Sequence, residues 1–250
     1  MGVAGYWWER FCLLSFAPFL IWTATVNPAY FGHLTYWTLC VHAVYFTVDK
    51  ASPHASTAVL VLHGLSFAGA MAILAGYTFI SLGGLYRFGS WLAWENAVGA
   101  RAGTVHHNRQ FAELAFQKAY EHLWPVIAIL VDARLSRDAL AATLKGLPKL
   151  RTTVISVGSF LLYATIWEQT TKVSGKGTPL DVYVQPTELA TSAILGKLGI
   201  SAPDLPEDLI FTNAQKATLI AVAFAAYWKV IAPLCADAKA KPATRKTKAK

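Results

Sequence analysis

The sequence predicts an all-α fold, namely a polytopic membrane helix bundle with about six transmembrane helices. Of its 250 residues, 55% are hydrophobic and only 14% are charged, whereas a soluble domain carries roughly 25% charged residues. The mean hydropathy is +0.40. A soluble fold of this length has too little interior to bury so much apolar surface, whereas lipid can solvate it. The nine Trp and ten Tyr residues cluster near the ends of apolar runs, as in the aromatic belts of membrane proteins.

Six apolar runs are candidates for the spans, each of which needs about 20 mostly apolar residues. They are residues 11–26, 35–48, 58–82, 119–131, 154–167 and 217–233. The fourth run is expected to extend toward its N-terminal side through residues 111–118. A shorter apolar piece, residues 91–98, is expected to lie in the membrane interface or to dip partly into the bilayer.

The order of the runs divides the chain into three expected parts. Residues 1–190 form the main membrane helix-bundle domain, residues 191–238 add a polar segment and a further transmembrane helix, and residues 239–250 form a basic C-terminal tail. With six spans and both termini on the inner side, most of the 22 Lys and Arg residues lie inside. That distribution agrees with the positive-inside rule and favours six spans over five.

The charge and the cysteines exclude several classes of function. The net charge of +8 comes largely from the tail, which we expect to contact anionic lipid or an acidic partner rather than nucleic acid. Cys12, Cys40 and Cys235 lie in or beside apolar runs without a Cys-x-x-Cys motif, so we interpret them as buried thiols. No metal and no cofactor is expected. The membrane is either the mitochondrial inner membrane or the endoplasmic reticulum, which the sequence does not resolve.

Titratable and polar groups inside spans are costly and therefore mark candidate functional sites. Thr35, His42 and Asp49 share one stripe of the second run because they are spaced seven residues apart. The predicted topology places Thr35 and His122 at the outer ends of the second and fourth runs, where the two residues meet at a similar depth. A hydroxyl beside an imidazole is typical of nucleophilic catalysis, in which His takes the hydroxyl proton and the oxygen attacks an ester carbonyl. We therefore select Thr35 and His122 as candidate catalytic residues.

Each of these residues also has a structural interpretation. Thr35 is a candidate N-cap of its helix, and His122 is a candidate helix-packing or interfacial histidine. His42 and His63 are candidates for the axial ligands of a b-type haem held between two helices. The alternative for both is a histidine that is hydrogen bonded to a neighbouring helix.

Two segments resemble the androgen-induced-gene family of multi-pass membrane proteins. The first is Leu34-Thr35-Tyr36-Trp37-Thr38-Leu39, followed by Ala43-Val44-Tyr45-Phe46; the second is His122, an apolar helix with a Pro, and then Asp132 and Arg134. A fainter match comprises Ser156-Val157-Gly158, Trp167, Tyr183 and Pro186.

The resemblance covers roughly residues 10–186 and implies about six spans. It also implies an intramembrane threonine hydrolase of fatty acid esters of hydroxy fatty acids, with Thr35 and His122 in the positions of the family's Thr and His. The chain departs from the family pattern at Glu168 and Gln169, which stand where the family helix carries His.

Three functions are therefore compatible with the sequence. The first is a Thr/His lipid-ester hydrolase whose partners are membrane lipids. The second is a non-catalytic accessory subunit of a large membrane complex, such as a mitochondrial respiratory or ATP synthase complex. The third is a haem or quinone binding protein that uses His42 and His63.

Overall fold

The computed structural model describes residues 3–26, 31, 34–50, 56–101 and 110–145 in continuous stretches. It also describes eight isolated positions farther along the chain: Gly158, Ser159, Leu162, Thr165, Ile166, Gly199, Ala225 and Lys229. The described stretches are helical, and no strand occurs among them. The predicted all-α class is confirmed.

The first helix is longer than its apolar core predicts. α1 covers Val3–Val26, whereas the expected span begins at residue 11. The added turns carry Tyr6, Trp7, Trp8, Glu9 and Arg10, so a search for uninterrupted apolar sequence leaves them out. Pro18 lies inside α1 and removes one backbone donor there without ending the helix.

The next two helices agree closely with the expected runs. α2 covers Leu34–Thr47, and the side chain of Trp37 donates a hydrogen bond of 2.7 Å to the carbonyl of Phe31 just before the helix begins. α3 covers Ser56–Phe88 and is the longest described helix, with 33 residues. α4 covers Trp91–Arg101 and follows α3 after a turn at Gly89, whose φ of 66° suits glycine.

The fourth expected run, with its extension, is a single helical rod in three parts. α5 covers Phe111–Lys118, the π-helix η3 covers Ala119–Leu123, and α6 covers Trp124–Leu135. α7, which covers Arg137–Lys145, follows after Ser136. α7 carries several charged and polar residues and therefore lies outside the six predicted apolar runs. Its helical state instead follows from its Ala and Leu content and from Asp138 in the first turn, which suits the helix dipole.

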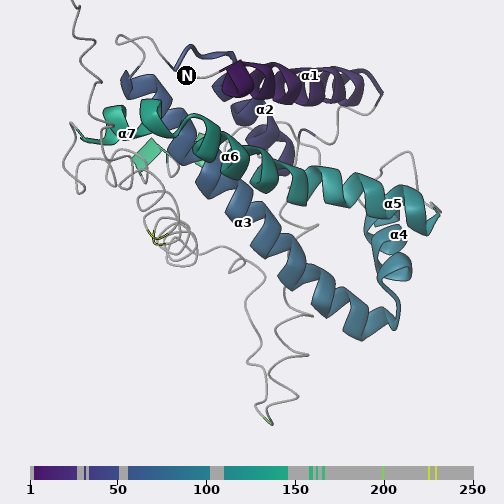
Figure 1. The fold of residues 1–250 in the computed structure, drawn as a ribbon. Helices are drawn as coiled ribbons and strands as arrows, with labels where there is room; N and C mark the ends of the chain where they lie inside the picture. The colour runs from purple at the N-terminus through teal and green to yellow at the C-terminus, as the bar shows by residue number, and fades with distance from the viewer. Residues whose placement is uncertain are drawn as a thin grey trace, which may run out of the picture.

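The helices pack as a bundle in which α2 contacts both α1 and α3, and the α5–η3–α6 rod contacts all three of these helices (Figure 1). α1 lies along α2 and α6, and α3 crosses the rod and continues beyond it to α4. Aromatic rings fill the centre: the ring of Phe16 lies 5.5 Å from that of His42 and 6.1 Å from that of Phe46.

The closest approach of α2 and α3 depends on a glycine. A Cβ atom at Gly69 would lie 2.6 Å from Cγ2 of Thr38, well inside van der Waals contact. Small residues allow helix backbones to approach in this way. Gly69 therefore fixes how tightly α2, which carries Thr35, packs on α3.

Two described helices are long and apolar enough to cross a membrane. They are α1, over Val3–Val26, and the Val61–Thr78 part of α3. The fifth and sixth expected runs, residues 154–167 and 217–233, lie outside the described residues except for a few isolated positions. The expected segments 191–238 and 239–250 lie almost entirely outside them as well.

Candidate functional site

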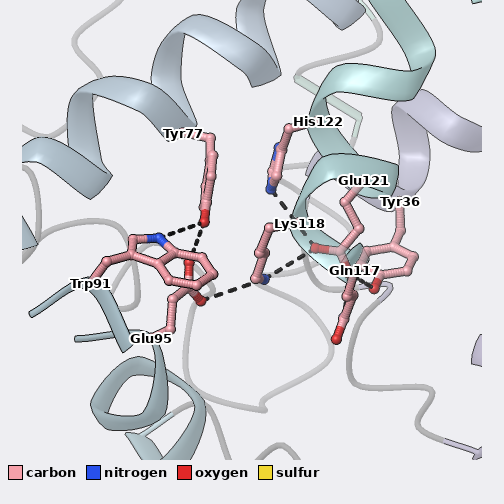
Figure 2. A network of polar contacts seen from close by, with 8 residues as sticks. All are labelled: Tyr36, Tyr77, Trp91, Glu95, Gln117, Lys118, Glu121 and His122. Atoms are coloured by element: carbon pink, nitrogen blue, oxygen red, sulfur yellow. Dashed lines mark hydrogen bonds and ion pairs between the residues drawn. The ribbon is translucent and has the colours of Figure 1, made fainter. Parts of the chain in front are cut away.

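The polar residues at one end of α2 form the Lys118 cluster, which comprises Tyr36, Tyr77, Trp91, Glu95, Gln117, Lys118, Glu121 and His122 (Figure 2). Glu121 and His122 both lie on the π-helix η3 and are buried. Short π-helical segments inside α-helices occur frequently at functional sites.

The local sequence explains why the π-helix forms at this point. Pro125 has no backbone N–H, so it cannot donate to the carbonyl of Glu121, and its ring crowds that carbonyl. The N–H of Trp124 instead donates to Ala119, five residues earlier. This π-type bond accommodates the proline and sets the direction in which Glu121 and His122 project.

Glu121 is the acceptor at the centre of the cluster. Its Oε1 accepts hydrogen bonds from the hydroxyl of Tyr36 and the amide of Gln117, each at 2.5 Å. Its Oε2 accepts one from the ammonium of Lys118 at 3.1 Å. Charge-assisted bonds of this kind stabilise the ionised carboxylate and fix its position.

Lys118 joins Glu121 to a second carboxylate. Its Nζ lies 3.7 Å from Oε2 of Glu95 on α4. The other oxygen of Glu95 accepts a hydrogen bond of 2.5 Å from the hydroxyl of Tyr77, which in turn accepts one of 3.1 Å from the indole of Trp91. The cluster therefore connects α2, α3, α4 and the rod.

The imidazole of His122 is held in a defined orientation. Its ring stacks on that of Tyr77, with centroids 4.0 Å apart and planes 5° from parallel (Figure 2). Nε2 of His122 lies 3.8 Å from Oε2 of Glu121, a distance for electrostatic attraction rather than a hydrogen bond. The ring can thus be stabilised as an imidazolium by the neighbouring carboxylate.

Thr35 lies on the α2 side of the same region. It is the second residue of α2 and is buried, so it sits inside the first turn rather than at the N-cap. Tyr36 and Glu121, the sequence neighbours of Thr35 and His122, are joined by the 2.5 Å hydrogen bond. The structure therefore brings the two segments that carry the candidate residues together.

His42 and His63 lie deeper in the bundle and away from this cluster. Both are completely buried. Nδ1 of His42 lies 2.9 Å from the carbonyl of Thr38, and the ring of His63 lies 5.5 Å from that of Tyr45. A haem between them would have to displace Phe16 and Tyr45, which pack on the two imidazoles. The haem hypothesis stays a prediction, which a Soret band of the purified protein would test.

A second polar group, which we term the Lys50 cluster, lies at the other end of α2 and comprises Glu9, Tyr45, Lys50, Asp132 and Ser136. Nζ of Lys50 lies 2.6 Å from Oδ1 of Asp132 and 2.7 Å from Oε1 of Glu9. The hydroxyl of Tyr45 donates to Oδ2 of Asp132 at 2.6 Å. Asp132 therefore pairs with Lys50, while Arg134, its neighbour in the sequence motif, is exposed.

The sequence analysis missed the partners that complete both clusters. Glu9, Lys50 and Lys118 lie near the ends of apolar runs, where charged residues are expected to face water or lipid headgroups, and Glu95 lies within the short apolar piece 91–98. One available signal was the presence of a basic and an acidic residue at each end of the predicted bundle, which suggests ion pairs between helices.

In comparisons with known proteins, no protein-family model, curated protein or solved structure matches the chain. The fold and the site therefore define its class on their own. The described chain is an all-helical protein with two helices that are long and apolar enough to cross a membrane. Two buried, lysine-centred polar clusters join these helices to the rest of the bundle.

Proposed function

We propose that the chain is a multi-pass membrane hydrolase of lipid esters, with Thr35 as nucleophile and His122 as general base. The observation that carries this proposal is the hydrogen bond between Tyr36 and Glu121, which ties together the two segments that hold these residues. The π-helix beneath His122 and the stacking on Tyr77 support it further, because a base must be held in a fixed orientation to act.

The reaction follows from the chemistry of these groups. The imidazole of His122 removes the proton from the Thr35 hydroxyl, and the oxygen attacks the ester carbonyl of the substrate. The alcohol part of the ester leaves with the proton that His122 has taken up, and an acyl-threonine remains. Water, deprotonated by His122, then releases the fatty acid and restores Thr35. Glu121 stabilises the imidazolium that forms in each half of the reaction.

A membrane location agrees with the surfaces of α1. Large apolar side chains point away from the bundle along this helix: Val3, Trp7, Phe11, Leu14 and Ile21. Exposed apolar surface of this extent on one helix suits contact with lipid chains. A substrate with fatty acyl chains would reach the bundle from the same lipid phase.

The test measures hydrolysis of a fatty acid ester of a hydroxy fatty acid by the purified full-length protein in detergent micelles. Thr35→Ala is expected to abolish turnover, and His122→Ala to lower it by about 10²- to 10⁴-fold. Thr47→Ala is the matched control because it makes the same change on the exposed side of the same helix. Thermal melts of all variants by circular dichroism show whether each one is folded.

A covalent probe gives a second readout. A lipid-like fluorophosphonate is expected to label Thr35, as located by peptide mass spectrometry, and to leave the Thr35→Ala variant unlabelled. Turnover at the wild-type level in Thr35→Ala would contradict the proposal.

A second candidate function is that of an accessory subunit in a large membrane complex, such as a mitochondrial respiratory or ATP synthase complex. The exposed apolar face of α1 favours it equally, since subunit interfaces within membranes are also apolar. Native gel electrophoresis from the source membranes in mild detergent distinguishes the two. Co-migration with a large assembly supports the subunit, and migration as a small free protein contradicts it.

A further inference from the structure

The Lys50 cluster contains an imbalance of charge in a place that excludes water. The side chains of Lys50 and Asp132 are 0% exposed and that of Glu9 is 10% exposed. With all three groups ionised, the cluster holds one positive and two negative charges. An uncompensated charge in such surroundings is strongly disfavoured, and proteins relieve it by pairing or by taking up a proton.

The hydrogen bonds show which carboxyl group is ionised. Asp132 accepts from Tyr45 at 2.6 Å, from Lys50 at 2.6 Å and from Ser136 at 3.2 Å. Both of its oxygens are thus engaged by donors, as the carboxylate form requires.

Glu9 is in a different position. Its partner among the described residues is the ammonium of Lys50, at 2.7 Å from Oε1. The charges that act most strongly on Glu9 within the described chain come from Lys50, Asp132 and Asp49, one positive and two negative. Lys50 already neutralises Asp132, and no second ion pair of Glu9 with a basic residue occurs among the described residues.

Neighbouring described groups on α1 and α3 do not change this balance. Cys12 on α1 is completely buried close to it. His63 on α3 packs on Tyr45 and interacts with Asp132 and Lys50. Arg10 lies over the ring of Tyr6, 5.2 Å from its centroid.

We propose that the Lys50 cluster is a proton-binding site that holds one exchangeable proton on Glu9. Lys50 and Asp132 then form a neutral ion pair, and the protonated Glu9 faces the ammonium of Lys50 with its uncharged carbonyl oxygen. Glu9 is also the route to water, because it alone among the three side chains is partly exposed. This site is separate from Thr35 and His122, and the proposal does not depend on the hydrolase.

The test is infrared spectroscopy of the full-length protein at neutral pH in an ester-free detergent, because lipid ester carbonyls absorb in the same region. We expect the carbonyl band of a protonated carboxylic acid, shifted to lower frequency in D2O as a mark of exchange. Glu9→Gln is expected to remove the band. Glu113→Gln, at an exposed position in the first turn of α5, is the matched control and is expected to keep it.

Two further variants test the charge balance itself. Asp132→Asn leaves one positive and one negative charge, so Glu9 is expected to ionise and the band to disappear. Glu9→Asp keeps a carboxyl group and is expected to shift the band rather than remove it. A wild-type spectrum without a protonated carboxyl band overturns the proposal without any variant. A band that survives in folded Glu9→Gln overturns it as well.

Discussion

The two lysine-centred clusters stand at opposite ends of α2 and differ in how tightly they enclose their lysine. Tyr36 and Tyr45, which belong to one cluster each, are nine residues apart, or about 14 Å along a helix. Lys50 has no exposed side-chain surface and holds its carboxylates at 2.6 and 2.7 Å. Lys118 is 21% exposed and holds its carboxylates at 3.1 and 3.7 Å.

The difference separates a tightly enclosed junction between helices from a cluster whose lysine is partly exposed. The Lys50 cluster joins α1, the end of α2 and α6 by direct ion pairs. The Lys118 cluster includes an imidazole, a π-helix and a lysine that solvent can reach. Looser packing and an imidazole suit an active site, whereas at a junction between helices looser packing lowers the stability of the fold.

Removing each lysine is the strongest test of this comparison. Lys50→Met leaves two buried carboxyl groups without their partner, and we expect it to lower the free energy of unfolding by about 3–5 kcal/mol. Lys118→Met is the matched variant and is expected to cost less, because Lys118 is 21% exposed and water can enter the space it leaves beside Glu95 and Glu121. Denaturant unfolding in detergent, followed by circular dichroism, measures both. Equal losses would show that the two clusters do not differ as described.

The positions of the helices along the chain could be predicted from the sequence far better than the contacts between the helices. The apolar runs predicted α2 to within one residue, because helix formation in apolar sequence depends on local pattern, whereas α3 continues to Phe88, six residues beyond its run. Thr35 and His122 could be selected because the predicted topology places a hydroxyl and an imidazole at a similar depth, and because both match the pattern of the resembled family. Lys50 and Glu9 could not be paired from the sequence, since their contact depends on how α1 packs against α6.

The contact between α2 and α3 at Thr38 lies between the two clusters along α2. A single substitution can overpack it. Gly69→Ala places a methyl group 2.6 Å from Cγ2 of Thr38, and we expect a loss of about 1–3 kcal/mol of unfolding free energy from overpacking. Thr38→Ser removes that Cγ2 atom, so the double variant is expected to recover part of the loss. A double variant no more stable than Gly69→Ala would place the strain elsewhere.

The two tyrosines of α2 offer a matched pair of smaller changes. Tyr36→Phe and Tyr45→Phe each remove one hydrogen bond to a carboxylate, and each is expected to cost about 1.5 kcal/mol of unfolding free energy. Only Tyr36→Phe is expected to lower ester hydrolysis as well, because it loosens the link between Thr35 and His122. Loss of hydrolysis in a folded Tyr45→Phe variant would contradict this separation.

The smallest expected effect concerns the charge beside the base. Glu121→Gln keeps the shape of the side chain and removes the charge that stabilises a protonated His122. We expect kcat to fall about tenfold, equivalent to about 1.4 kcal/mol of activation free energy, with KM unchanged. Asp132→Asn makes the corresponding change in the Lys50 cluster and is expected to leave kcat unaltered in the folded protein.

The π-helix between α5 and α6 has a consequence for the spacing of residues along the rod. It is the geometric equivalent of a one-residue insertion, because its backbone bonds span five residues instead of four. Deleting a single residue within Ala119–Leu123 would remove the π-type bond, so Pro125 would crowd a carbonyl of the preceding turn and His122 would turn relative to Tyr77. Deleting one residue from the regular helix of α6 would instead rotate Asp132 away from Lys50. The rod therefore depends on one extra residue in this short stretch, and that stretch carries the candidate base.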